Sequence, residues 1–130
     1  MVVSGGKTGP QRVLVADDHK VMRQALVAIL SNQTDIQVVG QAANGREAVE
    51  LARTLGPDVV LMDVVMPEMD GIAATRQIKL DNPQVKVIGL SMMEGDAVAN
   101  QLLTAGAETY LSKGGSAEAL IEAIRGCGKT

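Results

Sequence analysis

The chain has 130 residues, 46% of them hydrophobic, and a formal net charge of −3, which suits one folded domain with a sizeable core. The negative net charge excludes a basic surface for nucleic acid, and the apolar runs are far shorter than the roughly 20 residues of a membrane span. A single cysteine excludes an internal disulfide, and a single histidine excludes a zinc site built from several histidines. These features predict a cytoplasmic protein in which residues 1–11 form a flexible leader.

The first half of the chain alternates strand segments with helix segments. Residues 12–16 form a short apolar strand, and residues 19–31 follow with apolar side chains at helical spacing. Residues 36–40 form the second strand. Asn44 is the predicted N-cap of the next helix, which ends at Gly56.

The same alternation continues to the end of the chain. The remaining predicted elements are strands at residues 58–62, 86–90 and 108–111 and helices at residues 71–80, 96–105 and after Ser116. Residues 58–62 have the most continuous apolar run, which predicts a central strand covered on both faces. The buried stripe of the last helix is predicted at Ala117, Leu120, Ile121 and Ile124. Strict alternation with short connections predicts one doubly wound α/β domain, with a parallel sheet between two helical layers.

Polar side chains follow four of the predicted strands at the point where each strand ends. Asp17 and Asp18 follow the first strand, Asp63 ends the third, Ser91 follows the fourth and Lys113 lies just past the fifth. Ligands bind at the carboxyl ends of strands in this class of fold, so these side chains are expected to meet at one edge. Each residue taken singly also fits a helix cap or a solvated turn.

The expected cluster has a chemistry of its own. Crowded carboxylates repel one another, and Mg²⁺, which takes carboxylate, carbonyl and water oxygens, offsets that repulsion. Lys113 supplies a second, fixed positive charge. Asp63 ends the most apolar strand and is the best candidate for a carboxylate that attacks phosphorus to form an aspartyl phosphate.

Four segments resemble the motifs of bacterial response regulators. They are Asp17-Asp18, residues 61–71 (LMDVVMPEMDG), residues 90–92 (LSM) and residues 110–113 (YLSK). In this order they resemble the receiver domains of two-component response regulators, and they are most similar to the NarL/FixJ (LuxR-type) group. The resemblance covers residues 12–125 and implies a CheY-like, flavodoxin-like fold with five helices and strand order 2-1-3-4-5.

The resemblance implies a phosphorylation site with a metal. Asp63 would accept a phosphoryl group from a phosphohistidine of a sensor histidine kinase. Asp18 and Asp63 would bind Mg²⁺ directly together with the backbone carbonyl of Val65, and Asp17 would act mainly through water.

The resemblance also implies the parts of a switch. Lys113 would pair with Asp63 and then with the phosphoryl oxygens, and Ser91 would hydrogen-bond the phosphoryl group. Tyr110 would change rotamer when Ser91 moves, and the surface formed by residues 92–110 would carry the output.

The chain departs from many receivers at two places. Gly114 follows Lys113 where many relatives have proline, so the isomer of this peptide bond is left open. Val65 and Met93 are apolar where some relatives have polar side chains, and we expect them to alter the lifetime of the phosphoryl group. His19 is expected only to open the first helix.

Two other functions stay open at this stage. A small Mg²⁺-dependent phosphatase with Asp63 as nucleophile is one, although haloacid dehalogenase phosphatases have an acid where this chain has Val65. A receiver that is never phosphorylated and only binds proteins is the other. The NarL/FixJ resemblance also implies a helix-turn-helix effector domain beyond this chain, with residues 126–130 as a tail or the start of a linker. A homodimer is possible, and this chain itself is expected to bind no nucleic acid and no membrane.

Overall fold

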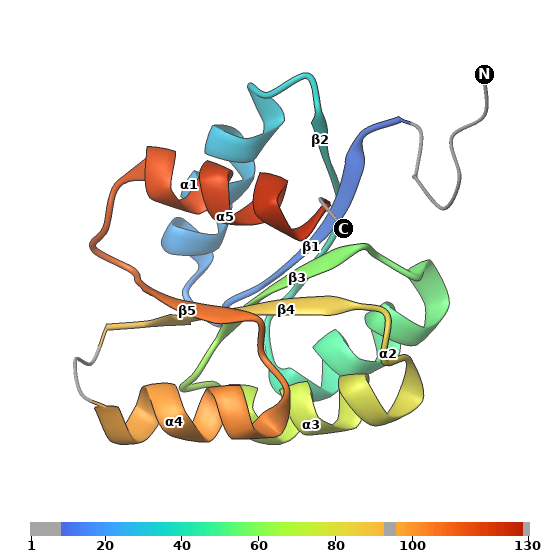
Figure 1. Ribbon diagram of the computed structural model, residues 1–130, viewed down its shortest axis with the longest axis vertical. Helices are drawn as coiled ribbons and strands as arrows, with labels where there is room; N and C mark the ends of the chain where they lie inside the picture. Colours follow the sequence, from blue (N-terminus) through green and yellow to red (C-terminus); the bar gives the residue numbers. More distant parts are fainter. Residues whose placement is uncertain (1–8, 93–95, 129–130) are drawn as a thin grey trace.

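The computed structural model describes residues 9–92 and 96–128, and five parallel strands form its sheet (Figure 1). The strands are β1 (Gln11–Ala16), β2 (Ile36–Ala42), β3 (Val59–Asp63), β4 (Lys86–Ser91) and β5 (Thr109–Ser112). Their order across the sheet is β2-β1-β3-β4-β5, and every neighbouring pair is parallel. The predicted doubly wound α/β fold and its strand order are confirmed.

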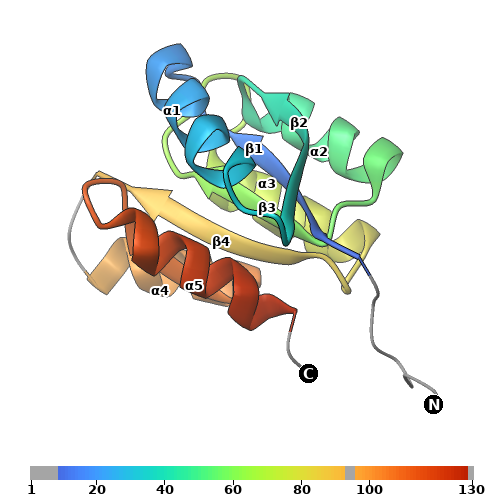
Figure 2. The same cartoon turned by 90° about the horizontal axis from the view of Figure 1, so that it is seen from above.

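Five helices cover the two faces of the sheet. They are α1 (Lys20–Ser31), α2 (Gly45–Leu55), α3 (Gly71–Asp81), α4 (Asp96–Ala105) and α5 (Ala117–Cys127). Helices α1 and α5 lie on one face, and α2, α3 and α4 lie on the other (Figures 1 and 2). The part of the chain that the structure describes has no helix of the length and apolarity that a membrane crossing requires.

The core is aliphatic and divided by the sheet into two clusters. Along β1, Val13 and Val15 pack toward α1 and α5, whereas Leu14 and Ala16 pack toward α2, α3 and α4. Successive strand residues point to opposite faces, so a strand covered on both sides must be apolar throughout. All five residues of β3 are buried, which confirms its predicted central place.

Side chains that cap helices fix where three of the helices begin. Asn44 Oδ1 accepts a hydrogen bond from Glu47 N at 2.8 Å, and Glu47 Oε1 accepts one from Ala43 N at 2.8 Å. This pair resembles a capping box, but Glu47 accepts from the residue before the N-cap and not from the N-cap itself. Ser116 Oγ accepts from Ala119 N at 3.0 Å, so both predicted caps are confirmed. Asp70 caps α3 in the same way.

About half of the predicted boundaries are displaced by one or two residues. Strand β3 starts at Val59, one residue later than predicted. Asp58 precedes it, and its Oδ2 accepts a hydrogen bond from Arg12 N at 2.8 Å. Strand β1 starts at Gln11, one residue before the predicted domain start, and α5 extends to Cys127, two residues past the predicted end. The division into leader, domain and tail stays a prediction.

The predicted buried stripe of α5 is wrong at Ala117. Leu120, Ile121 and Ile124 are buried as expected, but Ala117 is exposed. Ala117 and Ala25 line a cleft of about 120 Å³ between α1 and α5 that is open to solvent. The first turn of α5 thus lies beside this cleft instead of against the sheet.

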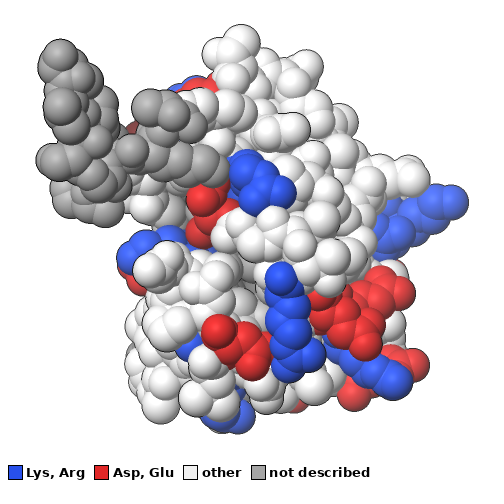
Figure 3. Space-filling view, turned by 90° about the vertical axis from the view of Figure 1, so that its right-hand side faces the viewer, with Lys and Arg blue, Asp and Glu red and all other residues white. Residues whose placement is uncertain are grey.

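Charges of both signs are interspersed at the end of the molecule where the strands begin. Figure 3 shows this side, with Lys and Arg lying among Asp and Glu. Ion pairs join elements that are distant in sequence, with Arg53 Nε 2.8 Å from Asp81 Oδ2 and Arg125 Nε 2.7 Å from Asp35 Oδ2. The side chains of the predicted site lie at the opposite end, where the strands finish.

Candidate functional site

The predicted site residues come together at the carboxyl ends of the strands. The side chain of Lys113, which follows β5, reaches Asp17 after β1 and Asp63 at the end of β3. Lys113 N also donates a hydrogen bond to the carbonyl oxygen of Ser91, at the end of β4, at 3.0 Å. Parallel strands with aligned registers place their carboxyl ends at one edge, which explains why these residues meet.

Lys113 is the centre of two buried ion pairs. Its Nζ lies 2.9 Å from Asp17 Oδ2 and 3.1 Å from Asp63 Oδ2. The three side chains are between 0 and 5% exposed. Because water is excluded, the ammonium is the main compensation for the two carboxylates within this group.

Burial and pairing shift the ionisation of this group. Burial raises the pKa of Asp63 from 3.8 to about 6, and Asp17 adds to the rise, while Lys113 opposes it. For Lys113, burial acts to lower the pKa, but Asp17 and Asp63 together outweigh it and hold that pKa above its ordinary value. Lys113 therefore keeps its proton more strongly than an ordinary lysine, and Asp63 takes up a proton more readily than an ordinary aspartate.

Asp17 and Asp18 are neighbours in sequence but differ in their surroundings. Asp17 is fully buried, and its Oδ1 accepts a hydrogen bond from His19 N at 2.9 Å. The other oxygen of Asp17 faces Lys113, so both oxygens of that carboxylate are in use. Asp18 is partly exposed, and its Oδ1 is a buried atom without a hydrogen-bond partner.

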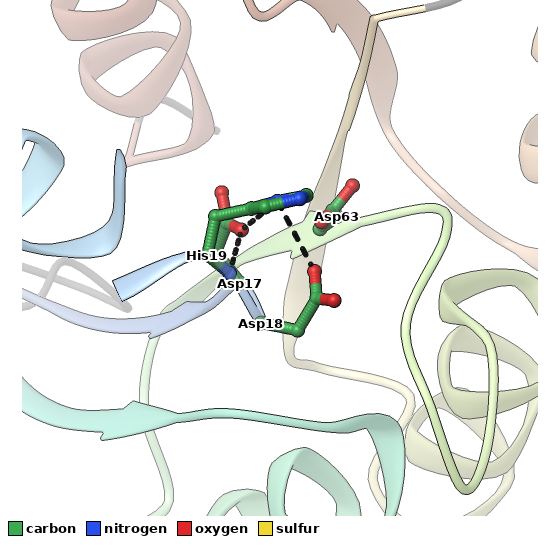
Figure 4. Close-up of side chains that lie close together, drawn as sticks. All are labelled: Asp17, Asp18, His19 and Asp63. Atoms are coloured by element: carbon green, nitrogen blue, oxygen red, sulfur yellow. Dashed lines mark hydrogen bonds and ion pairs between the residues drawn. The ribbon is translucent and has the colours of Figure 1, made fainter. Parts of the chain in front are cut away.

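The cluster fits a divalent cation. One side-chain ligand atom from each of Asp17, Asp18, His19 and Asp63 lies within 4.8 Å of the others (Figure 4). Three ionised carboxylates carry three negative charges, and Lys113 offsets one of them. A dication offsets the other two, whereas a monovalent cation leaves one unbalanced. Carboxylate oxygens are the ligands that Mg²⁺ prefers. The orphaned Oδ1 of Asp18 is an oxygen that such an ion would satisfy.

The remaining predicted residues lie around this cluster. Ser91 is 2% exposed, and Tyr110 is half-buried against the core on the side of α2, α3 and α4. Val65 is 63% exposed in the loop after β3, and Met92 is 71% exposed after β4. Met93 lies outside the described residues. No peptide bond in the described ranges is cis, so the bond between Lys113 and Gly114 is trans.

Gly71, at the start of α3, holds the loop after β3 close to the site. Its N–H donates to the carbonyl oxygen of Val64 at 2.7 Å, and a Cβ at this position would collide with the carbonyl of Asp63. Only glycine allows this approach between α3 and the backbone of Asp63. The place of Gly71 directly after the acidic turn is the sequence signal for this role, which was not predicted.

His19 is the second residue that the sequence analysis left outside the site. Its ring lies against both neighbouring carboxylates, with Nδ1 3.3 Å from Asp17 Oδ1 and 3.3 Å from Asp18 Oδ1. The adjacency to Asp18 in sequence was the available signal. Adjacency alone does not determine which way a side chain at a strand–helix junction points.

Comparisons with known proteins agree with this geometry. The model of the response regulator receiver domain family matches residues 13–125. The response regulator protein VraR of Staphylococcus aureus is 44% identical over 114 residues, which make up 88% of this chain and 54% of that relative. The chain therefore spans about half the length of the curated relatives that it matches.

Solved structures of response regulators have the same fold. The response regulator domain of Thermotoga maritima CheB has a TM-score of 0.87 and 38% identity, covering 93% of this chain and 98% of that one. A two-component response regulator of the LuxR family from Aurantimonas has a TM-score of 0.88 and 31% identity, covering 92% and 86%. The chain belongs to the response regulator receiver domain family, a regulatory family of two-component signalling.

Proposed function

We propose that Asp63 accepts a phosphoryl group from a phosphohistidine of a sensor histidine kinase and that this event switches the output surface of the domain. The observation that carries the proposal is the pairing of Asp63 Oδ2 with Lys113 Nζ at 3.1 Å beside two further carboxylates. A single carboxylate at the end of the central strand, with a fixed cation and a place for a second, suits phosphoryl transfer.

The transfer forms an acyl phosphate. A carboxylate oxygen of Asp63 attacks phosphorus, the P–N bond to the kinase imidazole breaks, and the imidazole leaves with its electron pair. With a pKa of about 6, Asp63 is mostly ionised at neutral pH and so is ready to attack. Lys113 pairs first with Asp63 and then with the phosphoryl oxygens, on which it offsets negative charge.

Asp18, Asp63 and the backbone carbonyl of Val65 would hold Mg²⁺ directly. When bound, Mg²⁺ neutralises charge on the phosphoryl oxygens. Asp17 would act mainly through water, because its two oxygens already contact His19 N and Lys113 Nζ. Asp18 Oδ1, which is buried and accepts no hydrogen bond, favours direct ligation by that residue.

Phosphorylation adds charge beside the end of β4, where Ser91 lies. The Ser91 hydroxyl would hydrogen-bond the phosphoryl group, and Tyr110 would change rotamer in response. The backbone N–H of Lys113, directly after β5, donates a hydrogen bond to the carbonyl oxygen of Ser91, so a movement of Ser91 would be transmitted to the end of β5. The surface formed by residues 92–110 would then present a different shape to a partner.

The domain would act as a regulator with slow autodephosphorylation instead of an enzyme that turns over. An aspartyl-phosphate phosphatase needs a general acid near its nucleophile, and Val65, two residues after Asp63, has no titratable group. In a full-length cytoplasmic protein the output would pass to a helix-turn-helix domain that controls transcription. A homodimer is one form in which that output would act.

Intact mass after incubation with a small acyl phosphate tests the proposal. We expect one added phosphoryl group on the parent in Mg²⁺, none in excess chelator and none on Asp63→Asn. Asp18→Asn should need a much higher Mg²⁺ concentration. Continuous release of phosphate over many turnovers would instead indicate a phosphatase. A folded parent that binds Mg²⁺ but gains no mass would indicate a domain that only binds proteins.

A further inference from the structure

The imidazole of His19 lies over the carboxylates that are proposed to hold the metal. Figure 4 shows the ring beside Asp17 and Asp18, and its Nδ1 is 3.3 Å from an oxygen of each. His19 is the N-cap residue of α1, but its side chain makes no capping hydrogen bond. The ring is therefore placed by the two carboxylates and not by the helix that it precedes.

The distance from His19 Nδ1 to Asp18 Oδ1 matches that between two ligands that share one ion. Metal–ligand bonds of about 2.0–2.1 Å place neighbouring ligand atoms about 3.0–3.4 Å apart. Both nitrogen–oxygen distances here are 3.3 Å. The contact with Asp17 Oδ1 is a long hydrogen bond, and the contact with Asp18 Oδ1 falls in the range expected for two ligands of one ion. A nitrogen lone pair at this point would face the same ion as the oxygens.

Two further observations favour a dication at this point. Asp17 and Asp63 are nine-tenths or more buried, and one oxygen of each is without a hydrogen bond, with only the ion pair to Lys113. Asp18 Oδ1 is likewise buried and has no hydrogen-bond partner. A second cation beside Lys113 would offset the remaining negative charge, and one ligand atom of His19 lies within 4.8 Å of one from each of the three carboxylates.

A nitrogen donor changes which dication the site favours. Mg²⁺ takes oxygen ligands, whereas imidazole nitrogen suits Co²⁺, Ni²⁺ and Zn²⁺. The geometry points to His19 as a metal ligand that gives this site a preference for first-row transition-metal dications over Mg²⁺. This inference rests on the metal site of the proposed function and extends it to the choice of ion.

The single histidine of the chain makes the ligand directly observable. In tag-free protein labelled with ¹⁵N-histidine, the imidazole resonances report on His19 alone. We expect Zn²⁺ to shift Nδ1 strongly as it becomes a ligand, and saturating Mg²⁺ to leave Nδ1 unligated. Calorimetric titration of Co²⁺ and of Mg²⁺ into the same protein gives the ratio of the two affinities.

Variants of His19 distinguish a metal ligand from a ring that only lies near the ion. His19→Ala and His19→Phe should each lower the preference for Co²⁺ over Mg²⁺ by at least about tenfold. As a matched control, His19→Ala combined with Gln84→His restores an exposed imidazole at the amino end of β4, far from the carboxylates. This double variant should behave like His19→Ala. Restored preference in the control would overturn the inference, since any surface histidine would then suffice.

The outcomes for the two proposals are distinct. The role of His19 would be overturned if Zn²⁺ left the imidazole resonances unchanged and the preference for Co²⁺ persisted in His19→Ala. The proposed Mg²⁺ site would not be affected by that result. An imidazole that responds to Zn²⁺ in a parent that is never phosphorylated in Mg²⁺ would support the ligand and contradict the phosphoacceptor proposal. Failure of every dication to bind would overturn both.

Discussion

The ammonium of Lys113 lies 3.1 Å from a carboxylate oxygen of Asp63, yet the pKa of Asp63 is above its ordinary value, as is that of Lys113. Burial is the largest influence on Asp63 and disfavours its charge. Lys113 keeps its charge because it faces Asp17 as well as Asp63. The ion pair is thus asymmetric, since one cation is shared by two carboxylates.

This asymmetry predicts how the stability of the metal-free domain depends on pH. The pKa of Asp63 rises from 3.8 to about 6 on folding, so the folded state favours the protonated carboxyl. The contribution of Asp63 to the free energy of unfolding that results from this shift is complete below pH 3.8 and is lost as the pH rises through about 6. At 1.36 kcal/mol per pKa unit, the rise corresponds to about 3 kcal/mol.

Asp63→Asn does not titrate at this position and serves as the reference. We expect its free energy of unfolding, relative to that of the parent, to increase by up to about 3 kcal/mol between pH 4 and pH 8. Urea denaturation in chelator, followed by far-ultraviolet circular dichroism, measures the difference. A difference that is constant over this range would contradict the raised pKa of Asp63.

Removing the shared cation should destabilise the domain. Lys113→Met keeps an unbranched side chain, one atom shorter, but leaves Asp17 and Asp63 without their common partner. At pH 8 we expect a loss of about 3–5 kcal/mol in the free energy of unfolding in chelator, because buried charges lose their compensation.

Lys86→Met is the matched control for this prediction. Lys86 Nζ lies 3.6 Å from Glu108 Oε1, and both side chains are more than a third exposed. Because water solvates this pair, its loss should cost less than about 1 kcal/mol. Equal losses in the two variants would show that the burial of the Lys113 pairs contributes nothing.

Gly71→Ala should disturb the site through the backbone. The added Cβ collides with the carbonyl of Asp63, so α3 must move away from the end of β3. We expect a loss of more than about 2 kcal/mol in stability and slower phosphorylation by an acyl phosphate. Gly126→Ala in α5 meets nothing within 4 Å and should instead stabilise by up to about 1 kcal/mol. Comparable stability of the two variants would contradict this role of Gly71.

Val65→Asn tests the prediction on phosphoryl lifetime. The side chain is 63% exposed, so the substitution should leave stability nearly unchanged. An amide at this point can orient water toward the acyl phosphate, and we expect dephosphorylation to be about two- to tenfold faster. Leu80→Asn, at an exposed apolar position in α3, is the control and should keep the parental rate. An unchanged lifetime in Val65→Asn would remove the idea.

Local patterns in the sequence determined the order and type of the elements. Alternating apolar segments, the caps at Asn44 and Ser116, and the continuous apolar run before Asp63 each depend on neighbours within a few residues. Such features act through short-range hydrogen bonds and burial, so they can be recognised in a single chain. The acidic and basic residues at the strand ends were predictable for the same reason.

Tertiary structure alone decided what depends on segments distant in sequence. The exposure of Ala117 follows from the cleft between α1 and α5, and the hydrogen bond from Arg12 N to the Asp58 side chain joins residues 46 positions apart. The sharing of Lys113 by two carboxylates and the turn of His19 toward Asp18 are likewise set by packing at the sheet edge. A local pattern fixes which residues reach this edge, but the distances among their side chains arise only when the strands align.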